Sequence, residues 1–179
     1  MPSTARPTAT YPDAFSPSSL YLAAFAQAGA PHVGLLIPSN AKSGCLVHIR
    51  IDSSTGPNWV YQCRRQQIEG YMFLVGLMKI HHSSDVRDTS SPDGAITSEQ
   101  LQDIAQTVSV PQNAMFGECR PWVLKVVEKL CEAGLLVLKD GASVEMLGRE
   151  FEEFAGGDRL KAYARRDRFP EVMVSKYCG

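Results

Sequence analysis

Residues 32–51, "HVGLLIPSNAKSGCLVHIRI", contain two apolar segments separated by a short polar one. The first segment, "HVGLLIPS" (32–39), has the composition of a strand. The second, "GCLVHIRI" (44–51), places Val and Ile at alternate positions, as a half-buried strand does. The polar "SNAKS" between them is typical of a hairpin tip. These residues therefore predict two antiparallel, adjacent strands.

Further strands are predicted on both sides of this hairpin. Residues 19–27, "SLYLAAFAQ", fit a strand or a short helix, and "WVYQC" (59–63) fits a third strand after the turn "DSSTGPN". The run "GYMFLVGLMKI" (70–80) is almost continuously apolar, which predicts the central strand of the sheet. Residues 81–94 have no periodicity and many turn formers, which favours a loop.

Three helices are predicted in the second half of the chain. The first follows Thr97 and Gln100, which have capping-box spacing. The second begins near Cys119 and ends at Gly134, and the third covers roughly residues 143–155. The residues expected to face the sheet are Leu101, Ile104 and Val108 in the first helix, Val123, Val126, Val127 and Leu130 in the second, and Val144, Leu147, Phe151 and Phe154 in the third. The tail after residue 160 is expected to add a short helix and a strand.

Strands followed by helices predict an α+β fold, with an antiparallel sheet of about four to six strands and helices packed on one face. The length of 179 residues and the 44% hydrophobic content fit one globular domain. Residues 1–18 are polar and rich in Pro, Ser and Thr, which favours a flexible N-terminal arm. Residues 19–179 are then the single α+β domain.

Composition and charge exclude several classes of protein. The 18 basic and 19 acidic side chains leave a net charge of -1, which provides no overall field for nucleic acid or an anionic membrane. The basic stretch 159–169 also contains Asp167 and fits a solvated surface better than a nucleic-acid site. The longest apolar run is too short to span a bilayer, and the N-terminus does not resemble a secretion signal. The five cysteines lack the spacing of a disulfide framework, so we expect reduced thiols in a soluble, cytoplasmic protein.

Cys119 is the candidate nucleophile because it lies where a helix begins. Unpaired backbone N–H groups and the helix dipole favour negative charge there. Pro121 supports this position, since proline is tolerated in the first turn of a helix. Cys119 precedes Trp122 and Val123 by three and four residues, so its sulfur should face the sheet together with theirs.

Two histidines of the hairpin are the candidate partners of this cysteine. With a tip at residues 39–43, His48 lies opposite Gly34, two residues from His32 on the same face. Both imidazoles can then point at one place. A thiolate nucleophile needs a base that also protonates the leaving group, and a partner that orients that base. We expect His32 to be the base and His48 to orient it.

Metal and nucleotide sites are not predicted. Cys45, His48, Cys63, His81 and His82 contain zinc-binding atoms, but Cys45 and His48 are an odd number of residues apart on one strand and so face opposite sides. The chain has no Cys-x-x-Cys pair, no Gly-x-Gly-x-x-Gly motif and no Walker motif. We therefore expect no metal and no cofactor.

The segment "HVGLLIP", the strand that contains "VHI", and a cysteine followed by "RPWV" together resemble the circularly permuted papain-like fold. That superfamily includes NlpC-like hydrolases, lecithin:retinol acyltransferase-like enzymes and permuted isopeptidases. The same landmarks are similar to those of small fungal proteins. The resemblance covers roughly residues 20–136 and implies a cysteine hydrolase or acyltransferase. Cys119 would be its nucleophile, His32 its general base and acid, and His48 the orienting residue.

The resemblance leaves the substrate and one alternative function open. Trp59, Trp122 and Glu118 are candidate substrate contacts, although Trp122 also fits a core position beneath its helix. The acyl source could be an amide, an isopeptide, a lipid ester or a thioester, and a role in small-molecule biosynthesis is equally compatible. Glu118 and Val33 stand where the acyltransferase group has asparagine and tryptophan. These differences favour the alternative, a catalytically inactive member that acts as a binding module.

Overall fold

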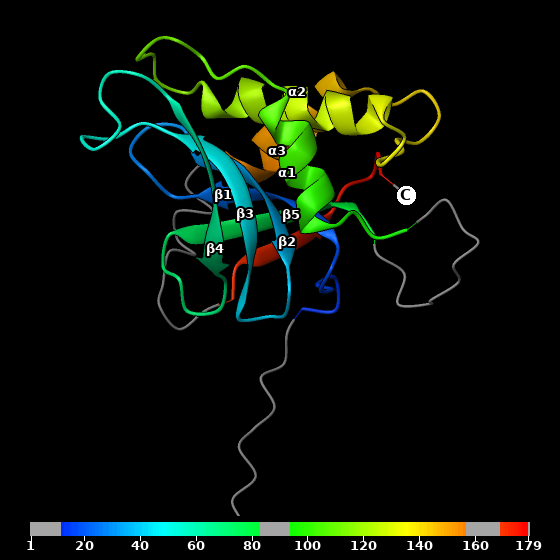
Figure 1. Cartoon of the computed structure of the whole chain (residues 1–179). Helices are drawn as coiled ribbons and strands as arrows, with labels where there is room; N and C mark the ends of the chain where they lie inside the picture. The colour runs from blue at the N-terminus through cyan, green and yellow to red at the C-terminus, as the bar shows by residue number, and fades with distance from the viewer. Residues whose placement is uncertain (1–11, 83–93, 157–168, 179) are drawn as a thin grey trace, which may run out of the picture.

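The computed structural model describes residues 12–82, 94–156 and 169–178 (Figure 1). Over these residues the chain forms six strands and three helices. The strands are β1 (Leu20–Phe25), β2 (His32–Pro38), β3 (Ser43–Arg50), β4 (Val60–Gln67), β5 (Leu74–His81) and β6 (Glu171–Val174). The helices are α1 (Ser98–Gln106), α2 (Cys119–Glu132) and α3 (Val144–Ala155). The predicted α+β class is confirmed.

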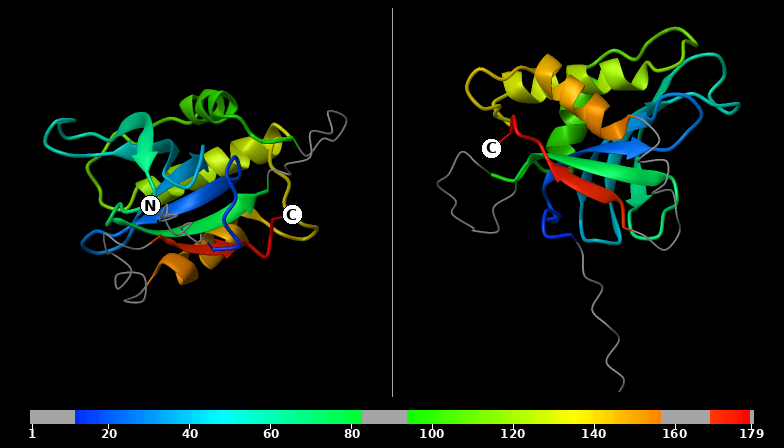
Figure 2. Two further views of the ribbon diagram at one scale, coloured as in Figure 1. Left: turned by 90° about the horizontal axis from the view of Figure 1, so that it is seen from below. Right: turned by 180° about the vertical axis from the view of Figure 1, so that it is seen from behind.

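The strands make one sheet in the order β4-β3-β2-β1-β5-β6. The prediction of an antiparallel sheet is only partly correct, because β6 pairs with β5 in parallel and the sheet is mixed (Figure 2). The prediction that residues 70–80 form the central strand is wrong, because β5 is the fifth of the six strands and lies next to the edge strand β6. A continuous apolar run reports burial on both faces, which β5 has, and not position in the sheet.

The β2–β3 hairpin forms as the sequence predicts. Leu35 pairs with Val47 and Leu36 with Leu46, and this register places His48 beside Gly34. At the tip, the backbone N–H of Ser39 donates to the carbonyl oxygen of Ser43. The side-chain oxygen of Asn40 accepts from the N–H groups of Lys42 and Ser43. The tip thus satisfies its own polar groups, which fixes the register of the two strands.

The helices begin and end close to the predicted residues. Thr97 and Gln100 form the capping box of α1. The helix α2 ends before Gly134, whose φ of 70° is the left-handed conformation that glycine favours. Ser143 caps α3 through a hydrogen bond from the N–H of Met146. The buried apolar residues of α2 and α3 include Val123, Val126, Val127 and Leu130, and Leu147, Phe151 and Phe154, as predicted.

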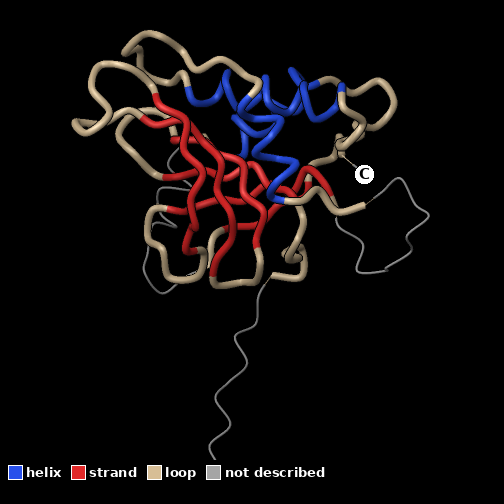
Figure 3. The backbone as a smooth tube through the Cα atoms, viewed as in Figure 1, coloured by secondary structure: helices blue, strands red, loops and turns tan. Residues whose placement is uncertain are grey.

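All three helices lie on one face of the sheet, as predicted (Figure 3). Val33, Leu35 and Ile37 of β2 belong to the core beneath them, which we call the helix-side core. The opposite face has a second cluster, which we call the open-face cluster and to which no described helix residue contributes. Its buried members are Tyr21, Ala23, Phe25, Leu36, Leu46, Ile68, Leu74 and Leu77.

The segment before β1 covers part of the open-face cluster. The ring of Phe15 lies 5.8 Å from the ring of Tyr21 and 4.9 Å from that of Phe169. Phe15, which belongs to the predicted arm, therefore packs on the sheet. Residues 1–11, most of the predicted 81–94 loop, the predicted tail helix and nearly all of the basic stretch 159–169 lie outside the described residues. Within the described ranges, no helix has the length and apolar character needed to cross a membrane.

Candidate active site

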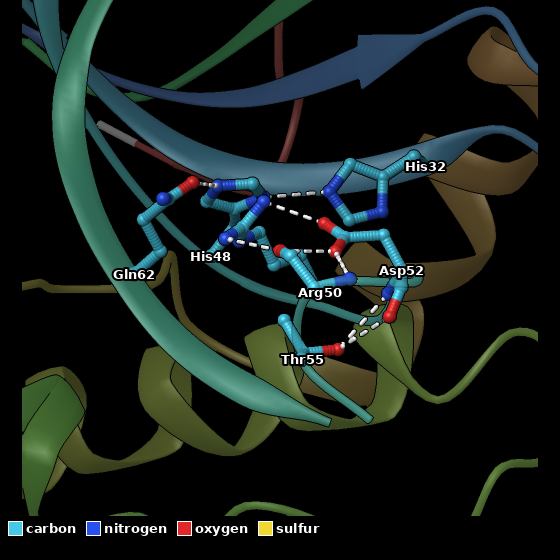
Figure 4. A network of polar contacts seen from close by, with 7 residues as sticks. His32, His48, Arg50, Asp52, Thr55 and Gln62 are labelled. Atoms are coloured by element: carbon cyan, nitrogen blue, oxygen red, sulfur yellow. Dashed lines mark hydrogen bonds and ion pairs between the residues drawn. The ribbon is translucent and has the colours of Figure 1, made fainter. Parts of the chain in front are cut away.

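Three neighbouring strands contribute one chain of hydrogen bonds on the open face of the sheet (Figure 4). Nε2 of His32 lies 2.7 Å from Nδ1 of His48. Nε2 of His48 lies 3.0 Å from Oε1 of Gln62, the residue paired with His48 across β3 and β4. The two imidazoles therefore meet at one place, as the sequence predicts.

The hydrogen-bond partners determine where the protons lie. Oε1 of Gln62 can only accept, so Nε2–H of His48 donates to it. Nδ1 of His48 is then an acceptor, and Nε2–H of His32 donates to it. This arrangement leaves Nδ1 of His32 with a free lone pair. His32 is thus held in the tautomer that a general base requires.

Gly34 makes room for the imidazole pair. A Cβ atom at this position would lie 2.7 Å from Cδ1 of Leu46 and 3.2 Å from Cβ of His48. Both neighbours are buried, so neither can move away freely. Because Gly34 has no side chain, β2 can lie close to β3 at the position of His48.

Both histidines are neutral at pH 7. Burial lowers the pKa of His32 to about 4, and the charge of Arg64 contributes to the same shift. Burial also lowers the pKa of His48 to about 4, followed by the effect of charge on His32, while the bond to Gln62 acts in the opposite direction. Arg64 lies two residues from Gln62 on β4 and therefore faces the same side of the sheet.

Cys119 lies on the other side of β2. It is the first residue of α2, its side chain belongs to the helix-side core, and it is 1% exposed. Its sulfur therefore faces the sheet, as predicted. Burial raises the pKa of the Cys119 thiol, although the backbone N–H groups of Val33, Arg120 and Cys119 itself act to lower it. The predicted helix N-terminus thus favours the thiolate, but burial outweighs it.

The thiol and the imidazole pair lie on opposite faces of the sheet at the start of β2. The side chain of Val33 points into the helix-side core, while His32 points the other way, toward Phe25, with ring centroids 6.0 Å apart. The Cys119 sulfur contacts the amide group that joins His32 to Val33. Among the described residues, no hydrogen bond joins the thiol to either imidazole. The structure therefore brings the two histidines together and places Cys119 at the backbone beside them.

The three candidate substrate contacts lie elsewhere. Trp122 is 2% exposed and its indole N–H donates to the carbonyl of Val108, which makes it the core residue that one interpretation of the sequence predicted. Trp59 is also buried, and its indole N–H donates to the carbonyl of Met115, 3.1 Å away. Glu118 precedes the first turn of α2 and makes no capping hydrogen bond through its side chain. None of the three lines the cavity beside α2.

This cavity has a volume of about 430 Å³ and lies between the β1–β2 loop, the segment before α2 and the end of α3. Its apolar lining includes Ala26, Ala30, Val33, Val75, Phe116 and Phe151. Gly117 and Arg120, on either side of Cys119 in the chain, also line it. Arg120 forms a 2.7 Å ion pair with Glu152, another lining residue, and this pair joins α2 to α3. The cavity therefore reaches the chain on both sides of Cys119.

No protein-family model, curated protein or solved structure matches this chain. The resemblance to permuted papain-like enzymes consequently rests on the sequence motifs alone.

Within the described residues, no three His, Cys, Asp or Glu side chains form a group that could hold a metal ion. Cys45 packs against the helix-side core, whereas His48 lies on the open face, in agreement with their odd separation.

The sequence analysis did not identify Gln62. The strand 59–63 was predicted, but its register with β3 was not, and only that register pairs Gln62 with His48. The sequence feature that could have indicated Gln62 is the row of polar residues at alternate positions of β4, Gln62, Arg64 and Gln66, which share one face of the strand.

Proposed function

We propose that this protein is a cysteine-dependent hydrolase or acyltransferase, with Cys119 as the nucleophile and His32 as the general base. One observation carries the proposal. The hydrogen-bonded chain from Gln62 through His48 ends on His32, and the amide that follows His32 contacts the Cys119 thiol. A base held in one tautomer and a thiol at a helix N-terminus are the two groups that acyl transfer by a cysteine requires.

The chemistry divides into two steps. In the first, Nδ1 of His32 takes the thiol proton while the sulfur attacks the carbonyl carbon of the substrate. The leaving group receives that proton as its bond to carbon breaks, which leaves a thioester on Cys119. In the second step, water or another acceptor attacks the thioester and Cys119 regains a proton through His32. Backbone N–H groups at the start of α2 would stabilise the oxyanion in both steps.

The resting site is neutral, because burial raises the pKa of Cys119 and lowers that of His32. The thiolate would therefore form only as its proton is transferred. His32 is the first residue of β2, where it pairs with Phe25 of β1 and its ring lies against the rings of Phe25 and His48. The proposed proton transfer therefore requires the His32 side chain to leave these contacts and turn around the start of the strand toward the thiol.

The cavity beside α2 is the site we assign to the acyl group. Its lining is mostly apolar, and its volume of about 430 Å³ lies in the range of small-molecule sites. An ester or thioester of a short fatty acid or an aromatic acid has the size and polarity that fit it.

The test uses p-nitrophenyl butyrate, a small activated ester, with the full chain at pH 7.5. We expect intact mass to show one butanoyl group, peptide mapping to place it on Cys119, and p-nitrophenolate release to continue with turnover. The variants C119A and H32N should abolish turnover, and H48N should reduce it about 10²-fold or more, because His32 loses its orienting partner.

The matched control is C131A, which removes a half-buried thiol from the same helix and should keep full activity. If Cys119 is acylated no faster than Cys131, or if H32N leaves that rate unchanged, the proposed activity is wrong.

The burial of Cys119 favours a second candidate function, a catalytically inactive module that binds an apolar ligand in the same cavity. The fluorescent probe 1-anilinonaphthalene-8-sulfonate can test it. We expect A30F to weaken probe binding, because Ala30 lines the cavity from an exposed loop, whereas A28F, in the same loop outside the lining, should not. Probe binding by C119A, combined with no acylation of the wild type, would favour this function. Equal binding by A30F and A28F would exclude the cavity as the site.

A further inference from the structure

Two cysteines outside the candidate active site lie in contact. Sγ of Cys45 on β3 is 3.3 Å from Sγ of Cys63 on β4. Both residues are free thiols and both are partly exposed. Among the described residues, no other two cysteine sulfurs form a hydrogen bond.

The register of the two strands explains this contact. Cys45 pairs with Arg65, and Cys63 pairs with Val47, so the cysteines are diagonal neighbours. Both pack against the helix-side core, which puts their side chains on the same face of the sheet. Diagonal side chains of a twisted pair are within reach of each other. A disulfide has a sulfur–sulfur distance of about 2.0 Å, so small rotations of both side chains would close the gap.

We propose that Cys45 and Cys63 form a reversible dithiol–disulfide site that fastens the edge strand β4 to β3. The oxidant would be a low-molecular-weight disulfide. This inference goes beyond the proposed function and does not depend on it, because neither cysteine takes part in the acyl-transfer steps.

The two thiols have different roles in the exchange. Burial, the hydrogen bond to Cys45 and the charge of ionised Cys45 together raise the pKa of Cys63 to about 12. The raised pKa keeps the Cys63 thiol protonated, so we assign the attack on the oxidant to the sulfur of Cys45. A mixed disulfide forms on Cys45 and one thiolate leaves. The sulfur of Cys63 then loses its proton to solvent and attacks the Cys45 sulfur. The second thiolate leaves, and two electrons have passed to the oxidant.

The position of the pair suggests what oxidation would change. β4 is an edge strand, held to the sheet on one side only by β3. Gln62 precedes Cys63 and forms the hydrogen bond that orients His48. A covalent link at position 63 would hold β4, and with it Gln62, in the register that the hydrogen bond needs.

The test equilibrates the folded full chain with glutathione and glutathione disulfide at increasing ratios, followed by acid quenching and alkylation. Oxidation should remove two hydrogen atoms from the intact mass. Tryptic digestion should link the peptide 43–50, which contains Cys45, to the peptide 51–64, which contains Cys63. Added dithiothreitol should separate them. The absence of this link at the most oxidising ratio, or a link between other cysteines in its place, would overturn the proposal.

Stability measurements distinguish the site from accidental oxidation. The link closes a loop between residues 45 and 63, so oxidation should raise the melting temperature by about 5 to 10 °C. C45S and C63S should each lose that shift, whereas C131S, a change at another partly buried cysteine, should keep it. A wild-type melting temperature that oxidation leaves unchanged or lowers would contradict a link formed without distortion of the two strands.

Discussion

The register of the hairpin puts the imidazoles of His32 and His48 on one face, and Gly34, opposite His48, leaves room for them there. We expect G34A to lower the free energy of unfolding by about 1 to 3 kcal/mol, the usual cost of an added methyl group in a packed core. The new Cβ would contact buried Leu46 and the Cβ of His48, and the carbonyl oxygen of Val47 would also crowd it. Urea unfolding at pH 7 measures this effect. The ¹H–¹⁵N spectrum of the imidazoles should change at the same time, since His48 must move.

The control for this substitution is G94A, because a Cβ at Gly94 would have no neighbour within 4 Å. Its effect on unfolding should stay within about 0.5 kcal/mol. Equal stability of G34A and the wild type, with unchanged imidazole resonances, would mean that Gly34 does not limit the approach of the two strands.

At the residue scale, the sequence predicts that His32 and His48 lie together, but it does not predict whether they lie on the face of the sheet that the helices cover. An even separation and a short tip were sufficient to place His32 and His48 together. β2 is buried on both faces, so its pattern does not show which face the helices cover. For that reason the position of Cys119 relative to the pair could not be predicted. Gln62 was missed because the register of β3 with β4 depends on the long connection between them.

At the scale of elements, local signals predicted most helices and strands, and non-local pairing limited the rest. The capping box at Thr97, the glycine at the end of α2 and the alternation along β3 each act within a few residues of the chain. Their chemistry is visible in the sequence. β6 pairs with β5 across nearly a hundred residues, and no local pattern specifies its partner or its parallel direction. Without a signal for this pairing, the sequence predicted an antiparallel sheet.

The same elements explain how the site is held. β2 and β3 position the histidines and α2 supplies the cysteine. α2 packs directly on β2, and its Val123 and Val126 are fully buried in the helix-side core. The ion pair between Arg120 and Glu152 joins the start of α2 to the end of α3, but both side chains are well exposed, so it contributes little stability. The position of Cys119 therefore depends on apolar packing of α2 and not on surface charge.

At the scale of the whole molecule, the sheet has two cores of different kinds, and this difference controls how stability depends on pH. The helix-side core is apolar apart from a few thiols, whereas the open-face cluster borders the imidazole pair and also Lys79. Lys79 is 6% exposed, burial lowers the pKa of its ammonium group, and the ammonium donates to the hydroxyl of Ser16. Polar groups that are buried on this face must remain neutral or find a partner. The two histidines remain neutral.

This neutrality predicts a loss of stability in mild acid. The pKa of each imidazole is about 4 in the folded protein and about 6.5 in the unfolded chain. Above pH 6.5 neither state binds the proton, and the folded state has its full stability. Between pH 6.5 and 4 only the unfolded chain binds it, so the free energy of unfolding falls as the pH falls. The loss is at most about 3 kcal/mol for each imidazole, and the repulsion between the two charges in the folded state already contributes to the low pKa of His48.

Urea unfolding at half-unit steps from pH 7.5 to 4.5 measures this loss. Carboxylates titrate at the acidic end of this range, so the informative quantity is the difference between variants. The double variant H32Q/H48Q should flatten the curve between pH 6.5 and 4.5, because it removes both groups whose proton affinity changes on folding. H82Q removes an exposed histidine and should keep the wild-type slope. If H32Q/H48Q and H82Q have the same pH dependence, the imidazoles are not buried in their neutral form, and the general base proposed for His32 would lack the environment that keeps it unprotonated below pH 6.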